Sequence, residues 1–276
     1  MGTKTKTFFI VSSGRSGTAM LHKALSAAGD IEMHHEYMVN IVQPLAVQRY
    51  QGLASRDEAL EVLNRIHGAA IAWSGASHWG DSSNKLSWLI PELAELAPTA
   101  KFVHLLRDGR KVAGSYFRKL SAECYDDRST AALAAHLCGQ ESAPPPEKKY
   151  WWPQPRPGDR WHAEFAAFDQ FTRIAWHWAE INRVILDSLA TLPERRQMFV
   201  RLEDLVASSA LVRSLFDFLE LPWRDEHFAA FARPHNVNRP EDQPLSERER
   251  ANFLRVAAPM MRRLGYDERD EYVVNY

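Results

Sequence analysis

The chain has 276 residues, of which 45% are hydrophobic and 25% are charged. These proportions are typical of a globular protein and exclude a disordered tail, a collagen and a low-complexity chain. A formal net charge of −1 does not favour broad binding to nucleic acid. Two cysteines, Cys124 and Cys138, are too few for a disulfide framework and fit no zinc spacing. No apolar run approaches the ~20 residues that span a bilayer, and no signal-peptide core follows the N-terminal lysines. We expect a cytoplasmic protein without membrane insertion, whose oligomeric state is open.

The first predicted element is a buried strand at residues 8–11, a β-favouring apolar run bounded by serines and a glycine. After a turn with two glycines, a helix is expected to bury one face and to end at Gly29. That face has the spacing i, i+3, i+4 and i+7 and consists of Leu21, Ala24, Leu25 and Ala28. The polar segment 33–37 follows, where a second strand is expected to end beside the first loop.

Strands and helices continue to alternate along the chain. The patterns predict a helix with a stripe from Leu86 to Leu93, a strand at 102–106, a helix after residues 107–110, a long helix over 171–185, and a strand at 198–202 followed by a helix start at Glu203 and Asp204. Ser246 and Glu249 form a capping-box pattern for a last helix that Gly265 closes. This alternation predicts an α/β fold, a single domain over residues 1–276 with a central parallel sheet flanked by helices.

Residues 121–161 break this pattern. The segment contains three successive prolines, then a Tyr-Trp-Trp-Pro run at residues 150–153, and ends near Trp161. Aromatic side chains this dense are unlike a solvated linker. We expect an irregular aromatic insertion whose rings either cap the edge of the core or form a lid over a ligand, and both interpretations stay open.

The turn at residues 12–18 has the composition of an anion site. Its two glycines permit a tight turn that aims successive N–H groups at one point, and the following helix adds a positive N-terminal end. Arg15 adds a charge and a planar fork suited to phosphate oxygens, and Ser16 and Thr18 add hydroxyl donors. An ordinary glycine-containing turn is the alternative. A triphosphate-binding P-loop is disfavoured, because no lysine stands between Gly17 and Thr18 and position 12 is not glycine.

Residues 107–116 form a second candidate anion site. Arg107 ends a predicted strand, and Ser115 lies about two helical turns further on. Ligands of open α/β sheets bind beyond the carboxyl ends of strands, so two such ends could hold a ligand with two separate phosphates. Alone, the segment is better explained as a solvated helix start with ion pairs among Asp108, Arg110 and Lys111, and only its pairing with the first motif makes this the weaker interpretation.

The pairing of the two motifs resembles the sulfotransferase family, whose members use 3′-phosphoadenosine 5′-phosphosulfate (PAPS). The resemblance covers most of the chain and is weakest over residues 121–161, which become a candidate acceptor-binding lid in a P-loop-like sulfotransferase fold. In the family the first loop holds the 5′-phosphosulfate, and the second motif and a C-terminal basic residue hold the 3′-phosphate. The resemblance implies cofactor-binding roles for Gly14, Arg15, Ser16, Gly17, Thr18, Ala19, Arg107, Ser115 and Arg239, with Arg233 as the alternative to Arg239.

Sulfuryl transfer needs in-line placement, positive charge on the leaving phosphate and a base for the acceptor. The charge is assigned to Arg15, where many family members have lysine; a guanidinium does not readily give up a proton, which argues against a proton-donor role. Glu36 is the first candidate for the base and His35 the second, since some relatives use a glutamate and bacterial members often carry a His-Glu pair here. Histidine has the more suitable ordinary pKa, whereas a glutamate needs partial desolvation. The resemblance makes His78 an outside candidate for the base, since many family members use a histidine from this general region.

The remaining polar and aromatic residues have plainer interpretations. Asp81 or a neighbouring serine is expected to cap the helix that starts near Leu86. The resemblance also implies a polar loop near the sulfuryl group here, with Asn84 and Lys85 as weaker candidates for contact with the sulfonate. Trp88 and Trp176 are assigned to the core. No metal is expected, because no cluster of residues has convincing ligand spacing.

The expected function is transfer of a sulfuryl group from PAPS to a hydroxyl or an amine, which leaves adenosine 3′,5′-bisphosphate. The acceptor is a small molecule or a carbohydrate that the sequence does not identify, and nucleic acid is not expected as a partner. Two alternatives stay open: a P-loop-like kinase of small molecules, and a nucleotide-binding module without catalysis.

Overall fold

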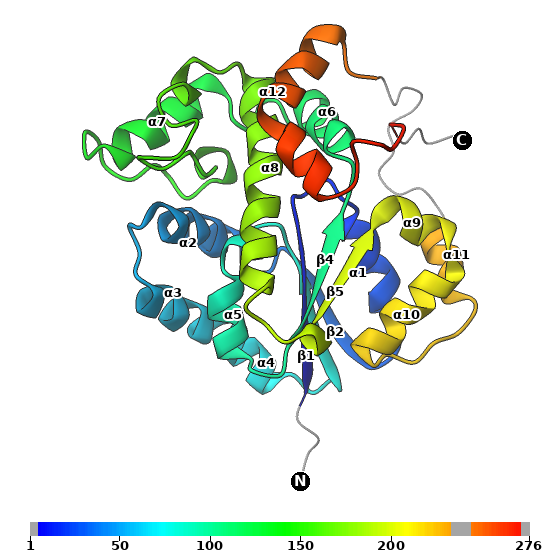
Figure 1. The fold of residues 1–276 in the computed structure, drawn as a ribbon. Coiled ribbons are helices and arrows are strands. Elements are labelled where there is room, and N and C mark those ends of the chain that lie inside the picture. Colours follow the sequence, from blue (N-terminus) through cyan, green and yellow to red (C-terminus); the bar gives the residue numbers. More distant parts are fainter. Residues whose placement is uncertain (1–4, 233–243, 272–276) are drawn as a thin grey trace. The chain divides into compact units, whose positions relative to one another are not determined.

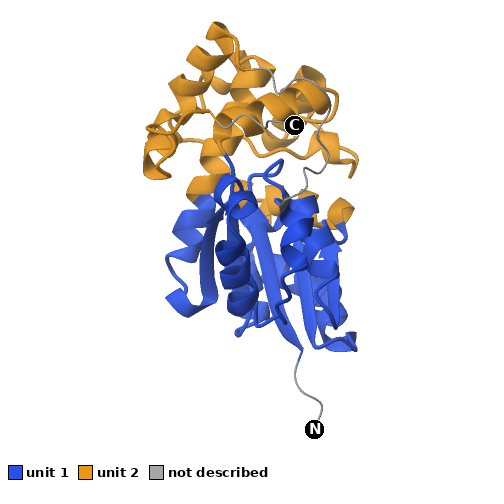
Figure 2. Cartoon of the chain, turned by 90° about the vertical axis from the view of Figure 1, so that its right-hand side faces the viewer, with its two compact units in different colours: residues 1–38, 56–107, 184–241 blue, residues 39–55, 108–183, 242–276 orange. Residues whose placement is uncertain are grey.

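The computed structural model describes residues 5–232 and 244–271 of the chain (Figure 1). The chain forms two compact units, each assembled from separate stretches of sequence (Figure 2). Unit 1 contains residues 1–38, 56–107 and 184–241, and unit 2 contains residues 39–55, 108–183 and 242–276. The expectation of one domain over residues 1–276 stays a prediction, and the two units are described in turn.

Unit 1 contains a five-stranded sheet in the order β2-β3-β1-β4-β5, in which every pairing is parallel. Its strands are β1 (Lys6–Ser12), β2 (Ile31–His35), β3 (His78–Ser82), β4 (Lys101–Leu106) and β5 (Gln197–Arg201). The predicted α/β fold with a central parallel sheet is therefore confirmed. The chain leaves central β1 towards β2 on one side and leaves β4 towards β5 on the other, so the loops after β1 and β4 diverge. Ligands of open α/β sheets bind at such a switch point, beyond the carboxyl ends of the strands.

Both faces of this sheet are buried, which explains the near-continuous apolar runs of β1 and β4. Phe8 and Ile10 point to one face, where a single hydrophobic cluster joins them to helices on that side. These helices are α1 (Thr18–Ser26), α9 (Leu202–Ala207), α10 (Ser209–Leu219) and α11 (His227–Ala232). Phe9 points to the other face, where its ring packs 5.5 Å from Phe102 and 6.2 Å from Trp79. The elements that follow β2 in unit 1 are α3 (Arg56–Leu63), η1 (Asn64–Gly68), α4 (Ala69–Trp73), η2 (Leu86–Trp88) and α5 (Ile90–Leu96), and η5 (Glu194–Arg196) precedes β5.

Two local expectations are corrected in unit 1. The apolar stripe from Leu86 to Leu93 is divided between η2 and α5, because Leu89 leaves helical geometry and Pro91 occupies the first turn of α5. Strand β3 was not predicted from the sequence His78–Ser82. All five of its residues are buried although three of them are polar or charged, so the alternation that marks a half-buried strand is absent. Asp81 therefore lies inside a strand and does not cap the following helix.

Unit 2 consists of helices and connecting segments. They are α2 (Val39–Gln51), α6 (Gly109–Lys119), α7 (Asp127–Leu137), η3 (Lys148–Tyr150), η4 (Phe165–Ala167), α8 (Gln170–Leu189, of which residues 184–189 belong to unit 1) and α12 (Glu247–Arg263). The capping box of Ser246 and Glu249 at the start of α12 is confirmed. None of the helices in the described part of the chain combines the length and apolar character that crossing a membrane requires.

The segment 121–161 is more regular than expected, because its middle forms α7, which Asp126 caps through the N–H of Ser129. Trp151 is buried beside Leu133 of α7 and donates its indole N–H to the Pro145 carbonyl at 2.8 Å. Trp152 is also buried and donates to the Glu123 carbonyl at 2.7 Å. These two rings therefore belong to the core of unit 2, whereas the role of the segment as an acceptor lid stays a prediction.

Candidate active site

The loop between β1 and α1 depends on left-handed backbone geometry. Gly14, Arg15 and Gly17 have φ angles of 77°, 53° and 97°, values that glycine adopts without steric cost. At Gly17, a Cβ atom would also lie 2.8 Å from Cδ1 of Leu202. The backbone angle therefore favours glycine at position 17, and an added Cβ would also have to displace the end of the Leu202 side chain.

Serine hydroxyls hold this loop in shape. The Gly14 N–H donates to Ser12 Oγ at 3.0 Å, and Ser16 Oγ donates to the Gly14 carbonyl at 3.0 Å. Ser87 of η2 also holds the loop, because its hydroxyl accepts from the Ser12 N–H and donates to the Ser12 carbonyl. The Ser16 hydroxyl, expected from the sequence to be a ligand donor, is thus engaged in shaping the loop.

The N-terminus of α1 follows at once. The first main-chain bond of the helix runs from the Leu21 N–H to the Gly17 carbonyl at 3.0 Å. The N–H groups of Thr18, Ala19 and Met20 therefore precede the helical ladder. No acidic side chain lies in this first turn, so the positive end of the helix is not neutralised locally. This arrangement is suited to an anion.

Arg107 brings the second motif to the first loop. It follows β4, the neighbour of β1 in the sheet, and its Nη1 donates to the Arg15 carbonyl at 2.8 Å. The structure therefore brings together two arginines that lie 92 positions apart in the sequence. Ser115 lies half-buried on α6 of unit 2. Arg233 and Arg239 lie outside the described residues.

Glu36 follows β2 directly and forms an ion pair with Lys85. The Glu36 N–H donates to the Ser82 carbonyl at 3.2 Å, and its Oε1 accepts from Lys85 Nζ at 2.6 Å. Lys85 Nζ also donates to Asn84 Oδ1 at 2.7 Å. The Lys85 side chain is 5% exposed and that of Glu36 is 20% exposed, so this charge-assisted bond is sheltered from water and correspondingly strong.

His35 lies beside Glu36 and is exposed. Its Nδ1 is 2.9 Å from the Ser82 carbonyl oxygen, which can only accept, so Nδ1 carries the proton and Nε2 is the acceptor of the neutral ring. The ring of His22 lies 5.8 Å away. Burial lowers the pKa of His22, the hydrogen bond to the Met33 carbonyl opposes this shift, and the neighbouring charge of His35 lowers the pKa further.

His78 lies at the amino end of β3, opposite the end of the sheet that carries the loop after β1. It begins β3 opposite Lys6, whereas Ser82, at the end of the same strand, lies opposite Ile10. Four residues of strand correspond to about 13 Å. The structure therefore does not bring His78 to the loop after β1, and its pKa is lowered chiefly by burial.

Two residues of this region were missed as functional candidates. Asp81 and His67 are fully buried in unit 1 and face one another, with 3.3 Å between Asp81 Oδ2 and His67 Nε2. Nothing in the spacing of residues 67 and 81 indicates this contact. Trp88 and Trp176 are buried as expected. Among the described residues, no group of histidine, cysteine and acidic side chains could hold a metal ion.

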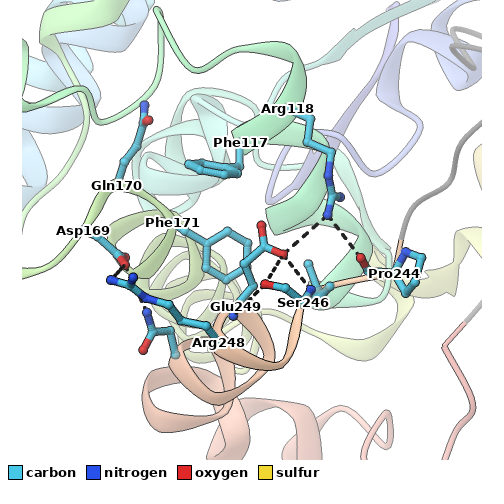
Figure 3. Close-up of a pocket in the computed structure, with 11 residues that line it drawn as sticks. Phe117, Arg118, Asp169, Gln170, Phe171, Pro244, Ser246, Arg248 and Glu249 are labelled. Atoms are coloured by element: carbon cyan, nitrogen blue, oxygen red, sulfur yellow. Dashed lines mark hydrogen bonds and ion pairs between the residues drawn. The ribbon is translucent and has the colours of Figure 1, made fainter.

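Unit 2 contains a separate cavity of about 750 Å³ (Figure 3). The rings of Phe117 and Phe171 form an apolar wall with their centroids 5.6 Å apart. Its charged groups pair with one another, as Arg118 does with Glu249 at 3.6 Å. None of the site residues expected from the sequence lines this cavity.

The sequence and the fold resemble those of known sulfotransferases. A model of the sulfotransferase family matches residues 7–225. A sulfotransferase from Alicyclobacillus acidocaldarius is 16% identical, with 96% of each chain covered and a TM-score of 0.54. Sulfotransferase STF9 from Mycobacterium avium is 10% identical, with 99% of this chain and 79% of that chain covered and a TM-score of 0.52. The sulfotransferase domain from the curacin biosynthetic pathway is 17% identical over 93% of this chain and 97% of its own, with a TM-score of 0.47.

At these identities the solved structures show a shared fold and no more. No curated protein matches the sequence. The family model, in contrast, covers most of the chain and includes the loop after β1, Glu36, Lys85 and Arg107. The chain belongs to the sulfotransferase family.

Proposed function

We propose that this sulfotransferase moves a sulfuryl group from PAPS to a hydroxyl or amine of a small-molecule or carbohydrate acceptor and releases adenosine 3′,5′-bisphosphate. The observation that carries the proposal is the hydrogen bond of Arg107 to the Arg15 carbonyl, since it joins the two motifs at one end of the sheet. A nucleotide with a phosphate group at each end suits two anion-binding loops at a switch point.

The nucleotide roles are proposed residue by residue. The 5′-phosphosulfate lies against the loop after β1, with the main-chain N–H groups of Ser16 to Ala19 as donors. The second arginine, Arg107, binds the 3′-phosphate together with Ser115 and Arg239. The left-handed angles at Gly14 and Gly17 support the first role, because they turn successive N–H groups towards one point. Full charge on Arg15 and Arg107 adds bidentate contacts.

The proposed transfer is a direct displacement at sulfur. The acceptor oxygen bonds to sulfur while the bond from sulfur to the 5′-phosphate oxygen breaks, and Glu36 takes the proton of the acceptor. Lys85 holds the carboxylate through Oε1, and Oε2 is proposed as the atom that receives the proton. Negative charge that develops on the leaving phosphate is stabilised by Arg15 and the N-terminus of α1.

His35 is the second proposal for the base, since its Nδ1 bond to Ser82 makes Nε2 the acceptor of the neutral ring. A cytoplasmic location, consistent with Cys124 and Cys138 being thiols, is also part of the proposal. The acceptor-binding role of residues 121–161 belongs to it as well.

The decisive experiment compares adenosine 3′,5′-bisphosphate with ATP and magnesium by calorimetric titration. The bisphosphate should bind more tightly, and PAPS should then support turnover with a panel of phenols, alcohols, amines and sugars. Tighter binding of ATP would support a kinase instead, and tight bisphosphate binding without turnover of any acceptor would support a binding module.

The base is tested by Glu36→Gln and His35→Asn, with Glu32→Gln as the matched control. Glu32 lies on the same strand as His35, and its carboxylate accepts from His34. Glu36→Gln should lower kcat by about 10²–10⁴-fold, while the bisphosphate still binds and Glu32→Gln remains active. Full activity of Glu36→Gln with loss of activity in His35→Asn would transfer the role of base to His35.

A further inference from the structure

His67 and Asp81 form a fully buried pair next to the turn that contains Glu36, the proposed base. Both side chains are 0% exposed, and Nε2 of His67 is 3.3 Å from Oδ2 of Asp81. Within residues 5–232 and 244–271, the other ring nitrogen of His67, Nδ1, has no hydrogen-bond partner. This assigns the ring hydrogen to Nε2, which donates to the carboxylate.

Aromatic rings surround His67 on one face of the sheet. The His67 ring lies 5.7 Å from Trp79, 6.3 Å from Phe9 and 5.4 Å from Tyr37, and its contacts with Trp79 and Tyr37 are edge-on. A carboxylate in such surroundings is costly unless it is well hydrogen-bonded. Packing alone would be served better by an apolar side chain at position 81, so the carboxylate calls for another explanation.

The explanation lies in the turn that carries Glu36. Asp81 Oδ1 accepts a hydrogen bond from the Tyr37 N–H at 3.4 Å. The residues on either side of Tyr37 are Glu36 and Met38, which have φ angles of 55° and 51°. Left-handed geometry at two non-glycine residues is strained and persists only where the surroundings enforce it.

The end of strand β3 holds this turn on two sides. Ser82 accepts the Glu36 N–H through its carbonyl at 3.2 Å, and the preceding residue, Asp81, accepts the Tyr37 N–H. His67 completes the arrangement from η1, a π-helical turn between α3 and α4. Such π-helical turns occur frequently at functional sites. The ring of Tyr37 packs edge-on against the ring of His67, which in turn donates to Asp81.

We propose that the buried His67–Asp81 pair is a positioning device that holds the Glu36–Tyr37 turn, so that the Glu36 carboxylate meets the acceptor and Lys85 in one geometry. The inference rests on the proposed function, because the position of Glu36 matters to turnover only if Glu36 is the base. Neither His67 nor Asp81 touches the reacting atoms; both act through the Tyr37 N–H and ring.

The test uses two substitutions of similar size at position 81. Asp81→Asn keeps an oxygen that accepts the Tyr37 N–H, whereas Asp81→Leu fills the space without an acceptor. Asp81→Leu and His67→Phe should lower kcat about 10–100-fold with unchanged affinity for adenosine 3′,5′-bisphosphate, and Asp81→Asn should restore most of the activity. Equal activity of Asp81→Leu and Asp81→Asn would overturn the proposal.

His104→Phe is the matched control. His104 is also a fully buried histidine and lies two residues along β4 from Phe102, on the face of the sheet that carries Phe9. This substitution should lower the thermal midpoint without the loss of kcat. A loss of kcat as large as that of His67→Phe would show a general effect of core disruption and would refute the specific role of the pair.

A second arm does not depend on activity. In the wild-type background, Glu36→Gln weakens the pair with Lys85 and should lower the urea midpoint. In the Asp81→Leu background the turn is displaced, so Glu36→Gln should have little further effect. An undiminished effect there refutes the positioning role, whereas failure of PAPS turnover in the wild type refutes only the proposed function.

Discussion

The guanidinium of Arg107 donates a 2.8 Å hydrogen bond to the main-chain carbonyl of Arg15. Arg15 has a φ angle of 53°, a conformation that a non-glycine residue keeps only when its surroundings hold it. Arg107 therefore stabilises the loop after β1 while it also provides charge at the end of β4. This bond couples the two loops, so a substitution in one of them should alter the geometry of the other.

Arg107→Ala should weaken binding of adenosine 3′,5′-bisphosphate by about 1.5–3 kcal/mol, the usual cost of one charged hydrogen bond. That corresponds to about 10–150-fold in Kd, measurable by calorimetry. The loss should be smaller for adenosine 5′-phosphate, which lacks the 3′-phosphate. Arg196→Ala is the matched control, because Arg196 also donates to a main-chain carbonyl, that of Ala100 at 2.9 Å. Undiminished affinity in Arg107→Ala would contradict the assignment of the 3′-phosphate site.

Arg15→Ala should reduce turnover more than affinity. Charge on the 5′-phosphate grows as the bond to sulfur breaks, so a cation at that position stabilises the transition state more than the bound nucleotide. Steady-state kinetics with PAPS should give a large fall in kcat and a smaller change in the Kd of the bisphosphate. Arg15→Lys keeps the charge and should recover part of kcat. Equal losses of kcat and affinity would assign Arg15 to binding alone.

Gly17→Ala should abolish nucleotide binding more than it destabilises the fold. A φ angle of 97° is strained for alanine and costs about 1–2 kcal/mol, and its Cβ would also displace Cδ1 of Leu202, 2.8 Å away. Gly52→Ala is the matched control, since its φ of 78° carries the same backbone strain but nothing lies within 4 Å of the added Cβ. Urea unfolding should detect destabilisation in both variants, and calorimetry a loss of bisphosphate binding in Gly17→Ala only. Normal binding by Gly17→Ala would contradict the proposed loop contacts.

Glu220 should make unit 1 sensitive to acid. Hydrogen bonds from Lys101 and Lys6 lower the pKa of its carboxyl from 4.5 to about 2, with the two ammonium groups at 2.5 Å and 2.6 Å. A lowered carboxyl pKa stabilises the fold above pH 4.5, and this contribution is lost as the pH falls from there towards 2. Because the side chain is 47% exposed, solvent screening limits the contribution to about 1 kcal/mol.

Urea unfolding of Glu220→Gln and the wild type at several pH values measures this contribution. The variant should be less stable at neutral pH, and the difference should vanish near pH 2. Glu226→Gln is the control, because the pair of Glu226 with Arg224 is long, at 3.5 Å, and both side chains are more than 70% exposed. A stability difference in Glu220→Gln that does not change with pH would contradict the ion-pair origin of the effect.

Much of unit 1 could be predicted from local patterns. The run at residues 8–11 indicated β1, and the stripe headed by Leu21 indicated α1, because burial on a strand and on one helix face leaves a regular spacing in the sequence. The loop between them was predicted as an anion site partly because of its two glycines, and both have positive φ angles in the structure; its role as an anion site stays a prediction. In unit 2, the capping box at Ser246 was also confirmed, since capping involves residues only three positions apart.

Strand β3 could not be predicted, because Asp81 and Ser82 are buried polar residues that break the apolar pattern. Because β3 was not predicted, the contacts of Glu36 with residues that follow β3 could not be predicted either. Lys85 lies 49 positions from Glu36 and comes beside it only because β2 and β3 are neighbours in the sheet. Helix α7 was missed as well, since prolines and aromatic residues in the same segment obscured its short apolar stripe.

The sequence by itself determined the two turns that contain Arg15 and Arg107 and the buried face of each predicted helix. These features depend on glycine geometry and on spacings of a few residues. Only the tertiary structure decided that Arg107 meets Arg15, that Lys85 meets Glu36 and that Asp81 is buried against His67. Those contacts follow from the order of strands in the sheet, which is set by the burial of both faces at once and leaves no local signature in the chain.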